Sequence, residues 1–408
     1  MNTRPYPKIV VSKKCESFLT GGHVWVYDNE ILSAEPCENG AVADVYTEKG
    51  KYLGSGFYNE HSKIRVRIVT KNANDRVDDG KFLSRRVSYA LAYRRTVMPG
   101  DDFKCCRLIF GEADGFPGLT VDRYGEILVA QCLCLGTDLR KNEIFTAIVE
   151  DLRAHGDKVE ALYERSDGSI RRLEGMEDCV GFFSGAGLRT DHDGKTEICE
   201  NGIYYAVDCI NGQKTGFFLD QKYNRAAAAR IAAGKTVLDC FTHTGSFALN
   251  AAKGGAKRVT AVDISEDAIA LAKENAARNG LDNIDFICAD VFDLLTDLYR
   301  SGSSPYDMII LDPPAFTKSS ATVKNAGRGY KEINGKAMRL LPRGGYLCTC
   351  SCSHFMTVPL FEKMLDEAAR DAGRRLLQIE ARAQAPDHPI LRGVPETEYL
   401  KFYLFQVI

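Results

Sequence analysis

The stretch TVLDCFTHTGSF, residues 236–247, contains an apolar run, an acidic residue, a glycine and the first positions of a helical pattern. Its first part, Thr236 to Cys240, predicts a short buried β-strand. A helix is expected from Ser246 to Lys253, with its unpaired N–H groups turned toward the loop. Gly245 lets the backbone come close to a ligand. A strand, an open turn and a helix in this order predict the first unit of a ligand-binding α/β domain.

The same alternation of strand and helix continues to the end of the chain. Further strands are expected at 258–262, 284–288, 308–311, 346–351, 376–384 and 398–407, and helices at 266–279, 291–300, 330–341 and 359–372. Apolar strands that alternate with helices predict a parallel sheet covered on both faces. Only a turn-rich link joins the last two strands, so we expect the final strand to be antiparallel. Such a sheet binds its ligand beyond the carboxyl ends of its strands.

Four successive strand ends carry an acidic residue: Asp239, Asp263, Asp290 and Asp312. A single aspartate there is more often a cap or turn residue, but four of them favour a ligand that is cationic or rich in donors. S-adenosylmethionine, with its sulfonium, ammonium, ribose diol and adenine amine, fits this ring. A nicotinamide dinucleotide fits badly, because its phosphates would be repelled and the G-x-G-x-x-G fingerprint is absent.

Two further domains are expected upstream, a small β-domain over residues 1–75 and an α+β domain over 76–190, with the α/β domain at 191–408. In the β-domain Lys63, Arg65 and Arg67 share one strand face. This face is either solvated or a contact strip for nucleic-acid phosphates, and both alternatives stay open.

Composition bounds the class of protein. The chain has 408 residues, 26% charged residues and a formal net charge of −2, so a nucleic-acid partner would need a local basic patch. No apolar run is long enough to cross a membrane, and the first residues have no signal-peptide core. The 14 cysteines fit reduced side chains of a cytoplasmic protein. We therefore expect no membrane partner, while a homodimer stays an open alternative.

Five motifs, in this order along the chain, carry a resemblance to a known family: Gly22–Tyr27, Arg107–Leu119, Gln213–Gln221, Asp312–Phe316 and Pro395–Lys401. On these motifs the chain resembles the RlmI-like family of bacterial 23S rRNA cytosine-5 methyltransferases over nearly its whole length. The resemblance implies a Rossmann-like class I methyltransferase domain with S-adenosylmethionine as cofactor. It also implies an N-terminal PUA-like domain that binds RNA, and 23S rRNA or its large-subunit precursor as the partner.

The resemblance also implies roles for individual residues. Lys214, Thr215 and Gly216 would cover the methionine end of the cofactor, and Asp239, Thr242 and Gly245 would line its sulfonium side. Asp263 would bind the ribose, Asp290 the adenine edge, and Asp312 would lie between the cofactor and the target base. No metal is implied.

Methylation at carbon 5 of cytosine needs an activated thiolate that adds to carbon 6 of an unstacked base. The stretch CTCSCSHF, residues 348–355, offers three alternating cysteines and His354. Neighbouring alternate positions of a strand lie about 6.6 Å apart, too far for one zinc site. Cys352, nearest the strand end, is the predicted nucleophile, with Cys350 as the alternative and Cys348 as core. Asp312 would hold the base, and His354 either activates the thiol or has no role.

Two other functions stay open. The chain could methylate a nitrogen of an rRNA base, although enzymes of that class typically carry Asn-Pro-Pro-aromatic where this chain has Asp312. It could also be a non-catalytic RNA-binding factor of ribosome assembly.

Overall fold

The computed structural model describes residues 4–302, 304–317 and 319–408, and the chain divides into two compact units. The first unit contains the chain up to Ile198 together with Val207–Leu219 and Pro386–Thr397. The second contains Cys199–Ala206, Asp220–Ala385 and Glu398–Ile408. Within the described residues, no helix is both long and apolar enough to span a membrane.

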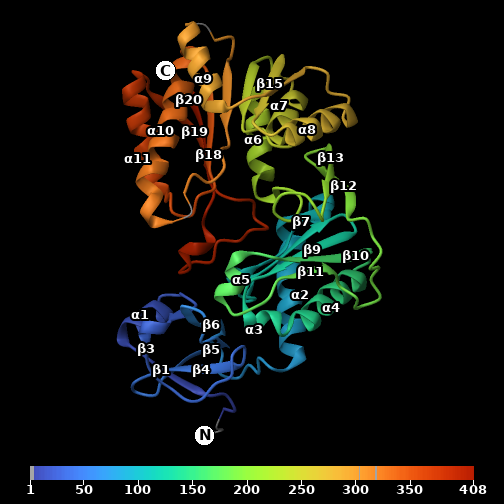
Figure 1. Ribbon diagram of the computed structural model, residues 1–408, viewed down its shortest axis with the longest axis vertical. Coiled ribbons are helices and arrows are strands. Elements are labelled where there is room, and N and C mark those ends of the chain that lie inside the picture. The colour runs from blue at the N-terminus through green and yellow to red at the C-terminus, as the bar shows by residue number, and fades with distance from the viewer. Residues whose placement is uncertain (1–3, 303, 318) are drawn as a thin grey trace. The chain divides into compact units, whose positions relative to one another are not determined.

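The first sheet of the first unit has six strands in the order β2-β6-β5-β4-β1-β3 (Figure 1). They are β1 (Lys8–Val11), β2 (Trp25–Tyr27), β3 (Ile31–Ala34), β4 (Val42–Thr47), β5 (Tyr52–Tyr58) and β6 (Ile64–Thr70). Helix α1 (Lys13–Thr20) packs Cys15 and Leu19 into a core with strand residues such as Ile9 and Val66. The predicted β-domain is confirmed.

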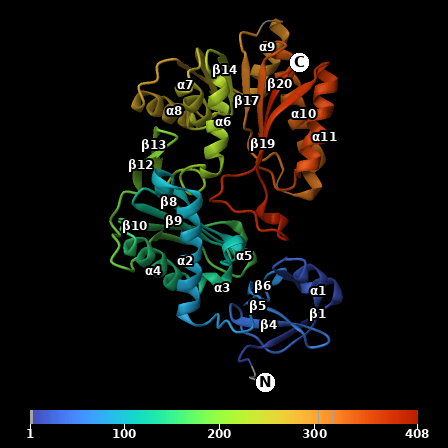
Figure 2. The ribbon, with the colours of Figure 1, turned by 180° about the vertical axis from the view of Figure 1, so that it is seen from behind.

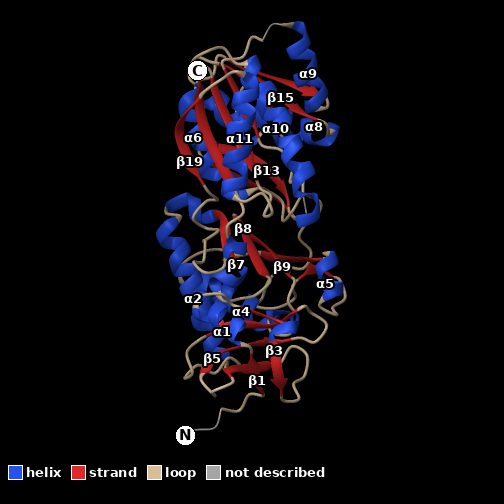
Figure 3. Cartoon of the chain, turned by 90° about the vertical axis from the view of Figure 1, so that its left-hand side faces the viewer, coloured by secondary structure: helices blue, strands red, loops and turns tan. Residues whose placement is uncertain are grey.

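The second sheet of the first unit has five strands in the order β11-β10-β9-β8-β7. They are β7 (Cys105–Phe110), β8 (Leu119–Tyr124), β9 (Ile127–Cys132), β10 (Ala161–Ser166) and β11 (Cys179–Phe182). Helices α2 (Gly80–Val97) and α4 (Lys141–Ala154) contact each other, and α2 lies along β7 (Figure 3). Short helices α3 (Leu135–Asp138) and α5 (Ser169–Leu173) complete this α+β part.

Neither interpretation of the basic strand face is correct for Arg67. Its guanidinium is buried, and it pairs with Glu112 at 3.2 Å and with Glu174 at 3.0 Å. Both glutamates come from the α+β part of the same unit, more than 40 residues along the chain. Because buried charges require partners, Arg67 links the six-stranded sheet to helical turns of the α+β part instead of facing water or phosphates.

The second unit is built on a seven-stranded sheet in the order β16-β15-β14-β17-β18-β20-β19. The strands are β14 (Thr236–Cys240), β15 (Arg258–Asp263), β16 (Ile284–Cys288), β17 (Met308–Leu311), β18 (Tyr346–Ser351), β19 (Leu376–Arg382) and β20 (Lys401–Val407). All ladders are parallel except those of β20, which is antiparallel to β18 and β19. The predicted doubly wound sheet with an antiparallel last strand is confirmed.

Helices cover both faces of this sheet (Figure 2). One core holds alanine-rich α6 (Lys222–Ala232) and α7 (Ser246–Lys253), and α8 (Glu266–Arg278) contacts α7. The opposite core holds α9 (Val291–Ser301), α10 (Val323–Leu340) and α11 (Val358–Ala372). A short two-stranded sheet, β12 (Lys195–Glu200) with β13 (Ile203–Asp208), precedes α6.

Candidate cofactor and catalytic site

The order of the strands reverses between β14 and β17, which are neighbours in the sheet although three strand–helix steps separate them. A doubly wound sheet opens a crevice at this point, beyond the carboxyl ends of its strands. The register aligns Cys240 with Leu311, so Asp239 and Asp312 lie near the same end of the two central strands. Asp263 ends β15, and Asp290 follows β16. The sheet therefore brings the four predicted carboxylates to one edge.

Asp239 is a carboxylate short of hydrogen bonds. It is fully buried, and the Thr242 hydroxyl donates to its Oδ2 atom at 2.6 Å. Its Oδ1 atom is buried and accepts no hydrogen bond from the described residues. Burial, together with the charges of Asp312 and Asp263, raises the pKa of Asp239 to about 7. A ligand that brings a cationic donor fits this atom, because it would satisfy both the hydrogen bond and the charge.

The loop after β14 has an unusual backbone. Phe241 and His243 have φ angles of +64° and +51°, which non-glycine residues rarely adopt. Gly245 has a φ of +82°, and a Cβ atom there would lie only 2.6 Å from Leu249 Cδ1. Glycine is thus strongly favoured where the loop enters α7.

Asp263 and Asp290 hold the neighbouring loops. Asp263 accepts hydrogen bonds from the backbone of His243 at 2.9 Å and of Ser265 at 3.0 Å. Asp290 caps α9, accepting from Phe292 at 2.7 Å through Oδ1. Ile264, next to Asp263, has 69% of its surface exposed, an unexpected position for a large apolar side chain. This isoleucine offers an apolar face for a planar ring beside Asp263, and its position in the sequence carried no signal of that role.

Asp312 belongs to a polar chain that the sequence did not indicate. The Gln221 side chain donates to Asp312 Oδ1 at 3.0 Å, and Asn224 donates in turn to Gln221 Oε1 at 2.7 Å. Both amides are buried at the start of α6. This chain of hydrogen bonds fixes the orientation of the Asp312 carboxylate.

Burial separates the three alternating cysteines. Cys348 and Cys350 lie within β18 and are fully buried, and burial raises the pKa of both thiols. Cys352 lies one residue beyond the end of β18 and is only half-buried. Its neighbour Ser351 donates a hydrogen bond to the Tyr330 hydroxyl of α10 at 3.0 Å. Among the three cysteines, the geometry favours Cys352 as the reactive thiol.

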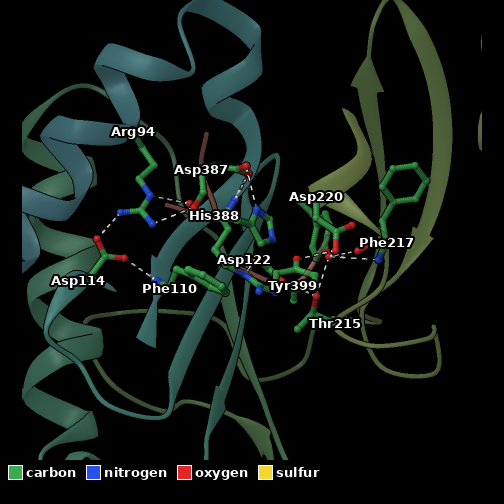
Figure 4. A network of polar contacts seen from close by, with 12 residues as sticks. Arg94, Phe110, Asp114, Asp122, Thr215, Phe217, Asp220, Asp387, His388 and Tyr399 are labelled. Atoms are coloured by element: carbon green, nitrogen blue, oxygen red, sulfur yellow. Dashed lines mark hydrogen bonds and ion pairs between the residues drawn. The ribbon is translucent and has the colours of Figure 1, made fainter. Parts of the chain in front are cut away.

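The remaining predicted cofactor residues lie in the first unit. The Thr215 hydroxyl donates to Asp122 Oδ2 at 2.5 Å (Figure 4). It also lies 2.8 Å from the Tyr124 hydroxyl. Lys214 Nζ stacks over the Phe218 ring at 4.1 Å, and Gly216 has a φ of +135°. These contacts order the segment around Thr215. The cofactor roles of Lys214, Thr215 and Gly216 stay predictions.

Two family models match the chain. The S-adenosylmethionine-dependent methyltransferase model matches residues 175–406, and the PUA-like domain model matches residues 9–71. Three similar proteins all carry the name ribosomal RNA large subunit methyltransferase I. The relative from Pseudoalteromonas atlantica is 40% identical over 96% of this chain and 97% of its own. The relative from Klebsiella pneumoniae is 38% identical over 99% of this chain and 99% of its own. The relative from Aeromonas hydrophila is 41% identical over 96% of this chain and 97% of its own.

Solved structures agree with the fold. A SAM-dependent methyltransferase from Streptococcus mutans superimposes with a TM-score of 0.81 at 23% identity, covering 98% of this chain and 99% of its own. A methyltransferase complexed with SAH reaches 0.82 at 22% identity with the same coverage. The chain therefore belongs to the S-adenosylmethionine-dependent methyltransferases, within the family of the ribosomal RNA large subunit methyltransferases I.

Proposed function

We propose that this methyltransferase transfers a methyl group to carbon 5 of a cytosine in 23S rRNA, through a covalent bond between Cys352 and the base. The names of the relatives support an rRNA substrate. The observation that carries the cysteine mechanism is the position of Cys352, half-buried just beyond β18, in a fold whose crevice also presents Asp312.

The described residues fit S-adenosylmethionine. The unsatisfied Oδ1 atom of Asp239 would accept from its ammonium group, and Asp263 still has acceptor capacity for the ribose diol. Asp290 and the exposed Ile264 would hold the adenine by an edge contact and a face contact. When bound, this cofactor supplies an electrophilic methyl group.

The protein would activate the base in three steps. The Cys352 thiolate adds to carbon 6, which makes carbon 5 nucleophilic enough to accept the methyl group. A proton acceptor then removes the proton from carbon 5, and the bond between the Cys352 sulfur and carbon 6 breaks to return the thiolate. Asp312, oriented by Gln221, would hold the N3/N4 edge of the cytosine during these steps. Because this edge must be unpaired and the ring must be unstacked, the target nucleotide has to lie outside a base-paired helix during the reaction.

An RNA that contains 5-fluorocytidine tests the proposal, because fluorine cannot leave carbon 5 and the covalent adduct accumulates. We expect the wild-type protein with S-adenosylmethionine to form an adduct that withstands denaturing electrophoresis. Cys352→Ala should abolish the adduct, and Cys350→Ala, the matched control two residues away, should retain it. An adduct in Cys352→Ala that is lost in Cys350→Ala would move the nucleophile to Cys350.

Nucleoside mass spectrometry of rRNA from cells that lack the protein identifies the product. Loss of one 5-methylcytidine is the expected result. Loss of an N-methylated base would contradict the cytosine-5 assignment, and absence of S-adenosylmethionine binding in calorimetry would leave a non-catalytic RNA-binding factor.

A further inference from the structure

A buried lysine lies beside the proposed nucleophile. Lys401 is the first residue of β20, and the antiparallel register places it opposite Ser351, the last residue of β18. Only 4% of its surface is exposed. Its ammonium group donates to the carbonyl oxygens of Ser353 at 2.6 Å and Tyr399 at 2.7 Å. The positive charge of Lys401 is therefore held at the turn that contains Cys352.

This ammonium group has hydrogen bonds but no buried carboxylate to balance its charge. In the described part of the chain no acidic side chain lies within ion-pair distance of Lys401. Glu398, whose charge favours the protonated form of Lys401, is exposed to solvent. Burial lowers the pKa of Lys401 to about 8, while the Cys352 side chain acts in the opposite direction and more strongly than Glu398. An uncompensated buried charge is unfavourable, so a negative group at Cys352 would stabilise it.

Other ionisable groups lie around Lys401 and this thiol. Tyr330 of α10 interacts electrostatically with Cys352, Asp312 after β17 interacts with Tyr330, and Glu398 before β20 interacts with Lys401. His354, two residues along the chain, is exposed. Among these groups of the described chain, Lys401 is the buried cation that interacts with Cys352.

We infer that Lys401 is the positioning residue that holds the Cys352 side chain as a thiolate, by acting as its counter-ion at the end of β18. This inference deepens the proposed function, since covalent catalysis needs a thiolate at neutral pH. It also assigns the activating role to a residue 49 positions away in sequence instead of to the neighbouring His354.

The rate at which iodoacetamide alkylates Cys352 tests the inference without RNA or cofactor. The full chain is alkylated at a series of pH values, and the peptide that contains Cys352 is quantified by mass spectrometry. We expect Lys401→Met to shift the midpoint of the rate upward by at least one pH unit, which means about tenfold slower alkylation near neutrality. Lys401→Arg should largely restore the wild-type midpoint. Lys336→Met, which changes a lysine paired with exposed Glu332, and His354→Ala should leave it unchanged.

Two outcomes would overturn the inference. One is an unchanged midpoint in a folded Lys401→Met protein, and the other is a shift of the same size in His354→Ala. If Lys401→Met does not fold, the wild-type protein still decides. The thiolate absorbance difference between wild type and Cys352→Ser must then rise at a midpoint below about 8.5, the ordinary value for cysteine, and a higher midpoint contradicts the inference.

The alkylation experiment and the 5-fluorocytidine experiment fail separately. A low alkylation midpoint without any RNA adduct would refute the proposed function and leave Lys401 as the counter-ion. An RNA adduct with an alkylation midpoint that is indifferent to Lys401 would do the reverse.

Discussion

At the scale of single residues, Asp239 combines a cost in stability with a gain in binding. Because its pKa is raised to about 7, the folded protein holds a proton that the unfolded chain has lost above about pH 4. The contribution of this group to stability therefore decreases as the pH rises from about 4 to 7. A buried carboxylate with a raised pKa is a common feature of functional sites in enzymes.

Asp239→Asn separates the two effects. Without cofactor, we expect a higher melting temperature than wild type at pH 8, because the buried charge is gone. For the wild type, affinity for S-adenosylmethionine should increase as the pH rises through 7, as the carboxylate ionises and attracts the cationic ligand. Calorimetry at pH 6, 7 and 8 measures this. The variant should bind weakly and show no such pH dependence, and an equally steep dependence in Asp239→Asn would contradict the assignment.

At the scale of elements, the two halves of α10 carry their positive charges differently. Lys324 and Arg328 in the first half are exposed and make no ion pair within the described residues. Lys331 and Lys336 in the second half pair with acidic side chains, at 2.9 Å to Asp371 and 2.6 Å to Glu332. The first half also lies close to the turn after β18, since Gly327 approaches the Met356 side chain.

The unpaired half of α10 is therefore expected to contact RNA phosphates. Replacing Lys324 and Arg328 by glutamine should weaken binding of a single-stranded RNA, and should reduce the slope of log affinity against log salt by about 1.4. Fluorescence anisotropy at several salt concentrations measures both. Lys331→Gln, on the same helix but already paired, is the control and should bind almost as the wild type does. An equal loss in the control would refute the assignment.

Elements with a clear hydrophobic pattern were predictable from the sequence, whereas the start of α10, which contains two glycines, was not. The strands at 236–240, 284–288, 308–311 and 346–351 were predicted with their observed bounds, because each is a short apolar run. Helix α10 was predicted from Tyr330 but begins at Val323. Gly327 and Gly329 disfavour a helix locally, yet Gly329 lies against the Phe316 ring, so tertiary packing decides there.

The carboxylates and Cys352 could be proposed from sequence because each lies at or just beyond the carboxyl end of a recognisable strand. Gln221, Tyr330 and Lys401 could not, because their contacts come from residues far along the chain and their types are common on any surface. Arg67 was misassigned for the same reason, since its partners Glu112 and Glu174 come from helical turns of the α+β part, 45 and 107 residues along the chain.

At the scale of the whole molecule, the first unit needs a segment from near the end of the chain. Arg94 of α2 is fully buried, and its guanidinium donates to Asp114 at 2.5 Å and to the Asp387 carbonyl at 2.9 Å. The Asp387 carboxylate accepts from the Arg107 backbone at 2.8 Å and from His388 at 2.9 Å. The segment Pro386–Thr397 is thus part of this unit's buried polar structure (Figure 4).

A fragment of residues 1–190, which ends where the sequence predicted a boundary, should therefore be less stable than the same region in the full chain. It lacks Asp387 and Thr215, and so leaves Arg94 and Asp122 with fewer partners. We expect a lower urea midpoint in hydrogen-exchange or proteolysis measurements on α2 and β8. In the full chain, Asp387→Ala should lower the midpoint in the same direction, whereas Arg392→Ala, an exposed residue of the same segment, should not. A fragment as stable as the intact protein would contradict this account.

This interleaved chain order has a consequence for synthesis on the ribosome. Translation proceeds at about 5–20 residues per second, so the interval between Ile198 and Thr397 lasts roughly 10–40 s. During that time the earlier part of the first unit has been made, but the Arg94 guanidinium and the Arg107 backbone N–H still lack Asp387, the partner that both contact in the folded protein. The amino-terminal part of the nascent protein therefore cannot complete this buried polar network until the segment Pro386–Thr397 has been made.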